Sequence, residues 1–220
     1  KDAYHHDYQF IIEETVNLLT ITLKKLFIDW INQLSIPDNL NEKKLNFLRK
    51  DGIYITFNYT ETLYSVYKIP ESNVLHIHGR ATKKDSDIIL GHAYKPKNKK
   101  LNHLQDILSD DSYTEEDIRI SQGNKIIEQY FIKTYKPTKQ IIESKKEFFS
   151  SLNKVEIIYI LGHSISKVDL AYFEEIIKNI TPHTVHWKIS YYHHNELEYF
   201  KNTIQKLGIS NNLVTFYKIN

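Results

Sequence analysis

Four short groups of polar residues in this 220-residue chain have the types and spacing needed for chemistry on a bound ligand. The groups are Asn58-Tyr59-Thr60, His76 and His78 with Gly79, Gly91-His92, and Gly162-His163-Ser164 with Asp169. An imidazole can accept a proton from a hydroxyl group or a water, and a nearby amide can position the group that loses it. His78 and Asn58 are of these two residue types, so they are the first candidates for general-base chemistry.

Each of these groups follows a predicted β-strand. The runs 53–57, 74–78, 88–90 and 155–161 are apolar or rich in β-branched and aromatic residues, and each stops at one of the groups. Open α/β sheets bind their ligands at the carboxyl ends of the strands. We therefore expect the four groups to lie at one sheet edge and to form an active site there.

The C-terminal half of the chain alternates predicted strands with amphipathic helices. Helices at 170–178 and 194–207 separate the strands at 155–161, 184–192 and 213–217. Strands and helices that alternate at this spacing indicate parallel βαβ units. The predicted fold class is α/β, with a mainly parallel, Rossmann-like sheet of about five strands that is flanked by helices.

The N-terminal part is predicted to be helical. Apolar residues recur at helical spacing over 8–34, and a shorter helix is expected over 41–50. We thus divide the chain into a helical segment, 1–50, which is inserted in or N-terminal to an α/β core, 51–220. Within the core, a polar and lysine-rich insertion is expected at about 93–113, and further helices at 118–133 and from Pro137 onward.

Composition excludes several classes of function. The chain has 29 Lys and Arg against 27 Asp and Glu, a net charge of +2 that gives no support to nucleic-acid binding. The absence of cysteine excludes disulfides, thiolate chemistry and cysteine-bound zinc.

No run approaches the roughly 18 apolar residues of a membrane span, and no leader is recognisable, so we expect a cytoplasmic protein without a membrane partner. The chain also contains no Met, and we expect that Lys1 is not the native N-terminus.

Two other enzyme classes fit parts of the pattern. Gly162-His163-Ser164 follows a strand and precedes a helix as a serine nucleophile elbow does, but Ser166 stands where that motif has its last glycine. A metal-dependent hydrolase is the other class, and it would use the histidines at the strand ends: His76, His78, His92 and His163. No acidic residue falls at the same strand ends, so we expect no metal.

Structural roles are the simpler explanation for some of these residues. Asn58 is of a type that often only stabilises a turn, and one of His76 and His78 is expected to be structural. His163, Ser164 or Asp169 could cap the helix that follows them. The pair His193-His194 is expected at the solvated surface.

The motifs together resemble a known family. FNYTETLYSVY, NVLHIHG, ILGHAY and IYILGHSISKVDLAYFEEI are similar, in order and in spacing, to motifs of the AbiH family of bacteriophage abortive-infection proteins. The resemblance runs from about Gly52 to the C-terminus. The family's glycine-rich first strand and turn, GNGFDLxxGL, is not in the sequence, so we expect Lys1 to lie downstream of it.

The AbiH family is in turn distantly similar to sirtuin-like NAD-hydrolysing defence domains, whose corresponding segments read TTNYD, LHG and GYSxxD. This resemblance implies that Asn58 lies by the nicotinamide ribose and that His78, before Gly79, is the catalytic histidine. It also implies that Gly79, Gly162, His163, Ser164 and Asp169 bind the NAD, with Gly162 and Ser164 in the turn that packs near the adenosine ribose and Asp169 the acidic residue that follows it. Thr60 departs from the aspartate of TTNYD.

The function implied by the resemblance is anti-phage defence in which NAD is the substrate and is hydrolysed at the nicotinamide–ribose bond. The implied partners are a nucleotide ligand and a phage-derived trigger protein, and the chain could form an oligomer. The alternative is a module that senses a nucleotide or a phage signal and catalyses no reaction.

Overall fold

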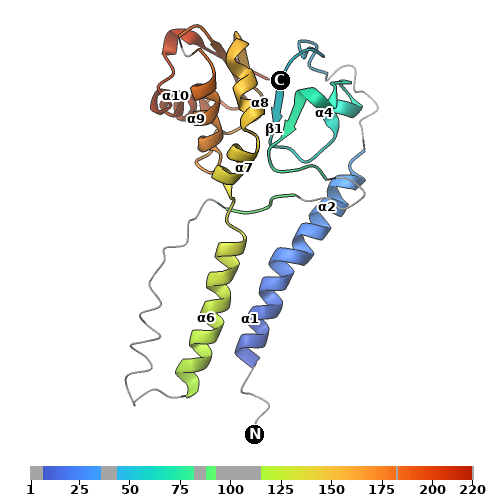
Figure 1. Cartoon of the computed structure of the whole chain (residues 1–220), viewed down its shortest axis with the longest axis vertical. Coiled ribbons are helices and arrows are strands. Elements are labelled where there is room, and N and C mark those ends of the chain that lie inside the picture. The colour runs from blue at the N-terminus through green and yellow to red at the C-terminus, as the bar shows by residue number, and fades with distance from the viewer. Residues whose placement is uncertain (1–6, 36–43, 82–87, 93–114, 182, 220) are drawn as a thin grey trace. The chain divides into compact units, whose positions relative to one another are not determined.

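The computed structural model describes residues 7–35, 44–81, 88–92, 115–181 and 183–219 (Figure 1). The chain forms two compact units, Lys1–Lys136 and Pro137–Asn220, which are described separately below. The division at residue 50 that the sequence suggested is a different one and stays a prediction. The lysine-rich insertion at about 93–113 lies outside the described residues.

Helices dominate the first unit. The helix α1 (Asp7–Asn17), the π-helical turn η2 (Leu18–Thr22) and α2 (Leu23–Gln33) follow one another almost without a break, which confirms the helix predicted over 8–34. The helix α6 (Glu115–Lys133) packs alongside α1 (Figure 1). Gly123 permits this close approach, because a Cβ atom there would overlap the ring of Tyr8.

A short parallel sheet completes the first unit. Its strands are β1 (Tyr54–Thr56) and β2 (Val74–His76), in a register that pairs Thr56 with His76. The helix α4 (Thr62–Ser65) and the 3₁₀ turn η3 (Glu71–Asn73) connect them. The core beneath this sheet includes Leu75 and Ile77.

Two sequence predictions for the first unit were wrong. Residues 88–90 are not a strand, because the Ile89 N–H donates to the His78 carbonyl while the Ile89 carbonyl accepts from the Tyr59 hydroxyl, so no ladder continues. Within the expected helix 41–50, the described residues 44–50 form turns. The Leu45 N–H there donates to the Tyr67 hydroxyl, a tertiary contact that replaces helical bonding in a segment too short to be stable alone.

The second unit begins with α7 (Thr138–Ser144), α8 (Lys146–Ser150) and the 3₁₀ turn η4 (Ser151–Lys154). It continues as a βαβαβ unit: β3 (Ile157–Ile160), α9 (Leu170–Asn179), β4 (His186–Tyr191), α10 (Glu196–Lys206), the 3₁₀ turn η5 (Asn211–Leu213) and β5 (Val214–Lys218). All three strands are parallel, in the order β3-β4-β5. This confirms the predicted parallel βαβ arrangement.

The central strand β4 anchors the core of this unit. Trp187 and Ile189 on β4 are buried, together with Phe149 of α8 and Ile204 of α10. Within the described residues, the parallel strands fall into two sheets, one of two strands and one of three, rather than into the single sheet of about five strands that we expected. At 88–90, the run that would have added a strand to the first sheet, Ile89 bonds to His78 and Tyr59 and forms no ladder.

Candidate functional site

The strand register of the first unit brings Asn58 and His78 to the same sheet edge. Each lies two residues beyond the paired residues Thr56 and His76, and the Ile77 N–H donates to the Thr56 carbonyl at 3.1 Å, which extends the pairing by one step. Asn58 is exposed at this edge, whereas His78 is only 3% exposed. The sequence placed both residues at a common edge correctly, but the burial of His78 could not be read from it.

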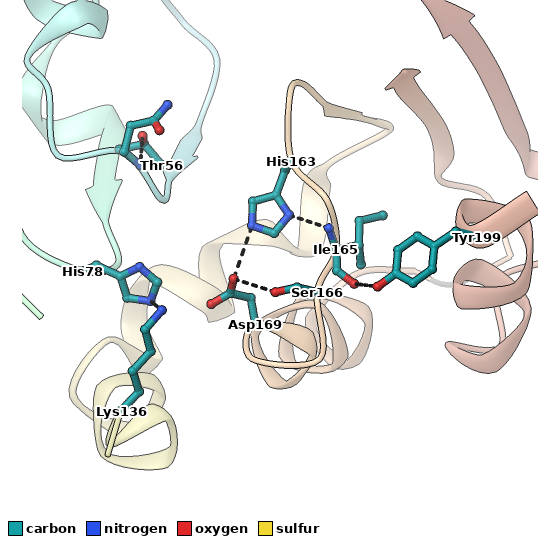
Figure 2. Close-up of polar contacts among 9 residues, drawn as sticks. Thr56, His78, Lys136, His163, Ile165, Ser166, Asp169 and Tyr199 are labelled. Carbon is teal, nitrogen blue, oxygen red and sulfur yellow. Dashed lines mark hydrogen bonds and ion pairs between the residues drawn. The ribbon is translucent and has the colours of Figure 1, made fainter. Parts of the chain in front are cut away.

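His78 lies among aromatic rings and one cation. The rings of Phe57 and Tyr59 lie with their centroids 5.7 and 6.4 Å from the imidazole, and Lys136 Nζ lies 3.5 Å from His78 Nε2 (Figure 2). An ammonium can only donate, so Nε2 accepts, and the neutral imidazole carries its proton on Nδ1. Lys136 itself is positioned by its N–H, which donates to the His92 carbonyl.

His76 has a structural role at the same edge. Its Nδ1 lies 3.2 Å from the Asn58 carbonyl, so Nδ1 donates to it, and its ring packs against Tyr64. Burial lowers the pKa of His76 from its ordinary value of 6.5. His76 therefore stays neutral and holds the backbone of the loop that carries Asn58.

The remaining predicted residues of the first unit make local contacts. His92 Nε2 lies 3.0 Å from the Thr134 hydroxyl, and Thr60 and Thr62 share a hydrogen bond of 2.9 Å between their side chains. Gly79 has a φ of 84°, a left-handed conformation that glycine adopts without strain. It is the residue that turns the chain away immediately after His78.

The second unit places the Gly162-His163-Ser164 turn at the carboxyl end of β3. Gly162 has a φ of 59°, and its N–H donates to the Ser190 hydroxyl at the end of β4, 3.0 Å away. Ile165 is fully buried and has a φ of 49°, which is strained for a β-branched residue. Its carbonyl accepts from the Tyr199 hydroxyl of α10 at 3.0 Å, so the turn is tied to both β4 and α10 (Figure 2).

His163 stabilises this turn through both ring nitrogens. Its Nδ1 accepts from the Ile165 N–H at 2.9 Å, which places the proton of the neutral imidazole on Nε2. Nε2 points at Asp169 Oδ2, 3.6 Å away (Figure 2). Because both nitrogens have partners within the turn, His163 orders the loop and does not present a lone pair to a ligand.

Asp169 is buried at the start of α9, but its carboxylate does not cap that helix. Its Oδ2 atom accepts from the Ser166 hydroxyl at 3.3 Å and faces His163. Below it, burial raises the pKa of the Tyr172 phenol to about 12, and the Asp169 carboxylate adds to the rise. Since α9 begins at Leu170, His163 and Ser164 are not its cap either.

A cleft of about 380 Å³ opens beside this turn. It lies where β3 and β4 end and α10 begins, and it is lined by Gly162, His163, Ser164, Ser190, Tyr191, Tyr192, Asn195, Glu196, Tyr199 and Phe200. Cavities that hold small ligands start at about 300 Å³ and combine aromatic walls with a few polar groups. No Lys or Arg occurs among the described lining residues, so the cleft suits an uncharged part of a ligand better than a phosphate.

Glu196 supplies the one carboxylate of the cleft lining. Its Oε2 atom accepts from the backbone N–H groups of Tyr192 and His193 at 2.8 and 3.1 Å. These two bonds lower the pKa of the Glu196 carboxyl from its ordinary value, so the group stays ionised. The carboxylate is thereby fixed in orientation at the mouth of α10.

The geometry bears on both alternative hydrolases. In a serine hydrolase the histidine would accept the Ser164 proton, but the two nitrogens of His163 face Ile165 and Asp169. For the metal-dependent class, the described part of the chain holds no group of three or more His, Asp or Glu side chains that could bind a metal ion.

Several residues of these sites were missed at the sequence level. Tyr191 is the last residue of β4, and Tyr192 and Glu196 follow it; the rule that selected Gly162 after β3 would have selected them as well. The exposed His193 and His194 were correctly placed at the surface. Lys136 gave no signal, because it is 58 residues away from His78 in the chain.

The two sheet edges define an α/β protein with a cleft of ligand size at the carboxyl edge of a parallel βαβαβ unit. The chain belongs to the AbiH family: the family model described as "Bacteriophage abortive infection AbiH" matches residues 1–191. Membership assigns the protein to bacteriophage abortive-infection defence and confirms the resemblance, which here extends through the N-terminal helical segment. No curated protein and no solved structure matches the chain.

The helices of the described residues were also compared with the requirements of a bilayer. None of them is both long enough and apolar enough to cross a membrane.

Proposed function

We propose that this AbiH protein acts in phage defence by binding NAD and hydrolysing its nicotinamide–ribose bond. The observation that carries the proposal is the aromatic cleft at the carboxyl ends of β3 and β4, next to the left-handed turn at Gly162. Sheets of this topology bind nucleotides at this edge. The adenosine portion of NAD is the part that the cleft would take.

The chemistry of the lining supports a nucleoside. Tyr192 and Tyr199 are 56% and 47% exposed and offer ring faces on which an adenine can stack. The ionised Glu196 carboxylate can accept hydrogen bonds from ribose hydroxyls, as the acidic residue of dinucleotide-binding sheets does. A carboxylate at this position also disfavours a 2′-phosphate, so NAD should bind more tightly than NADP.

The bond-breaking role falls on His78 and Asn58. Loss of nicotinamide leaves positive charge on the ribose, and the attacking water or a ribose hydroxyl must give up a proton as the new C–O bond forms. His78 is the group that would accept the proton, and the exposed Asn58 amide would position the oxygen that loses it. Lys136 would have to leave Nε2 before His78 could accept at that atom.

That last requirement favours a second candidate function. With the Nε2 lone pair directed at Lys136 and the ring 3% exposed, His78 is not available as a base in this arrangement. A protein that only senses a nucleotide needs the cleft but not an available base. The two functions differ in whether nicotinamide is released.

The decisive experiment follows nicotinamide release from NAD, with and without phage lysate as the source of a trigger. The hydrolase function predicts that the rate of nicotinamide release falls by at least about 100-fold in His78→Gln and in Asn58→Ala. A positioned general base usually contributes a factor of this size or larger. His186→Gln is the matched control, because this exposed histidine is the first residue of β4, at the amino end of the strand, and should leave the rate unchanged.

Release that persists in both variants would overturn the assignment of His78 and Asn58. Saturable NAD binding with no release under either condition would establish the sensing function in its place. Absence of NAD binding altogether would contradict both.

A further inference from the structure

Several polar groups that line the cleft of the second unit make hydrogen bonds within the fold. The Gly162 N–H donates to the Ser190 hydroxyl, and the Tyr199 hydroxyl donates to the Ile165 carbonyl. Both ring nitrogens of His163 face groups of its own turn. These bonds hold the cleft in shape, so recognition of a ligand depends on the polar side chains that are not used in this way.

Asn195 lines the cleft and has a side chain that a ligand can use. It is exposed and lies directly before α10, yet its carboxamide does not cap that helix. Within the described part of the chain, this carboxamide has no hydrogen-bond partner. The amide oxygen accepts and the amide nitrogen donates, so one planar group presents a donor and an acceptor side by side.

The backbone of Asn195 places its side chain beside a tyrosine ring of the cleft. Its φ of −66° and ψ of −19° are helical, so Asn195 and Tyr199, four residues apart, lie on the same face of α10 with about 5–6 Å between their Cβ atoms. The hydroxyl bond to the Ile165 carbonyl fixes the Tyr199 ring (Figure 2). A base that stacks on this ring would therefore have one edge within reach of the Asn195 carboxamide.

We propose that Asn195 recognises the base of the bound nucleotide and selects adenine. The proposal rests on the proposed function, in which the cleft takes the adenosine part of NAD. Adenine carries its N6 amino group next to N7, a donor beside an acceptor, and a carboxamide can pair with both. Hypoxanthine and guanine carry O6 next to N7, which are two acceptors. The amide oxygen of Asn195 would then face an acceptor, so these bases should bind more weakly.

The first test is calorimetric titration of the full chain with NAD and with its hypoxanthine analogue, in which a keto group replaces the N6 amino group. A bidentate amide–adenine pair discriminates between bases by a factor of about 5 to 150, so the wild type should bind NAD more tightly than the analogue by such a factor. In Asn195→Ala the two dissociation constants should agree within about twofold, because neither base keeps the pair.

Two further variants serve as controls for this preference. Asn202 is also an exposed asparagine of α10 but does not line the cleft, so Asn202→Ala should keep the wild-type preference. Tyr192→Ala should weaken the binding of both dinucleotides by the same factor, because a tyrosine ring stacks on either base. The preference for NAD should therefore be unchanged in both controls.

The second test uses adenosine and inosine, which carry the same two bases without pyrophosphate or nicotinamide. Ligand-observed NMR titrations should show tighter binding of adenosine to the wild type and loss of this preference in Asn195→Ala. Among the described residues that line the cleft there is no Lys or Arg, so the preference should not depend on phosphate groups.

The outcomes separate the base selection from the proposed function. Equal affinities of the wild type for NAD and its hypoxanthine analogue would overturn the base selection and leave NAD binding intact. A preference that survives in Asn195→Ala would overturn the role of Asn195. A protein that does not bind NAD but prefers adenosine through Asn195 would keep the base selection and overturn the proposed function. Absence of binding to NAD and to adenosine would overturn both.

Discussion

The two sheet edges of this protein end in similar motifs but organise their histidines in different ways. At the first edge, His78 is buried beneath aromatic rings with its Nε2 against Lys136, and the exposed residue is Asn58. At the second edge, His163 orders the turn, and the adjoining residues open onto a cleft. The position of a histidine next to a glycine after a strand therefore does not determine its role. The role depends on which groups bond to its two ring nitrogens.

The difference also concerns backbone strain. The second edge holds two residues in the left-handed region, Gly162 and the buried Ile165, whereas among the described residues of the first edge only Gly79 has a positive φ. Strained backbone at a turn persists only when the surrounding contacts fix it. The ties from Gly162 to Ser190 and from Ile165 to Tyr199 do so here.

The largest expected effect is on the free energy of unfolding, in variants of the two buried residues Ile165 and Ile77, which are 0% and 2% exposed. Replacing either by Ala should lower the free energy of unfolding by about 2–4 kcal/mol through lost burial and a cavity. A further change from Ala to Gly should restore about 1 kcal/mol at residue 165, where φ is 49°, and should cost about 1 kcal/mol more at residue 77. Urea denaturation measures the free energy of unfolding of all four variants. If the change from Ala to Gly had the same sign at both positions, the second turn would not be strained.

The next effect separates strain from binding. Gly162 and Gly208 have φ values of 59° and 74°, and a Cβ at either would meet no atom within 4 Å. Gly162→Ala and Gly208→Ala should therefore both lower the free energy of unfolding by about 1–2 kcal/mol. Only Gly162→Ala should also weaken NAD binding, as followed by calorimetry. Equal weakening by both would show that binding responds to stability rather than to this turn.

At the first edge, Lys136→Met should change the tautomer of His78 with little loss of stability. The substitution removes one hydrogen bond, so it should cost no more than about 1.5 kcal/mol in the free energy of unfolding. Nitrogen-15 spectra of the imidazole should report a proton on Nδ1 in the wild type and a shift of population toward Nε2–H in the variant. Identical spectra would mean that Lys136 does not determine the state of His78.

The smallest effect is a pH dependence from His76. Its pKa in the folded state is lowered by burial, so the unfolded state binds more protons below the ordinary value of 6.5. Its contribution to stability is complete above that value and is lost as the pH falls toward the lower folded pKa. His76→Asn keeps a donor for the Asn58 carbonyl but cannot titrate, so the slope of stability between pH 7.5 and 5.5 should become shallower. An unchanged slope would exclude His76 as its source.

Local patterns in the sequence predicted most of the elements but not their assembly into sheets. Helical periodicity over 8–34 and the strand–helix alternation after residue 155 were sufficient, because amphipathic faces follow from local spacing. The run 88–90 is as apolar as a strand, yet Ile89 bonds to His78 and Tyr59 outside any ladder. These tertiary hydrogen bonds compete with strand pairing, and nothing in the local sequence indicates them.

The same limit applies to the candidate site. Asn58, His78 and Gly162 were found because each follows a strand, and the family match extends over all of them. The contact of Lys136 with His78 depends on how a distant helix packs, so sequence spacing could not reveal it. The cleft residues at the end of β4 were overlooked because Tyr191 and Tyr192 resemble ordinary strand residues.

Calorimetric titration of NAD into the wild type, Tyr192→Ala and Tyr159→Ala tests most directly whether the cleft of the second unit binds the adenosine part of NAD. Tyr192 lines the cleft and is 56% exposed, whereas Tyr159, 41% exposed, does not line it. Loss of one stacking ring is worth about 1–3 kcal/mol, so Tyr192→Ala should raise the dissociation constant about 5- to 150-fold, with Tyr159→Ala unchanged. Equal affinities for all three proteins would contradict binding at this cleft.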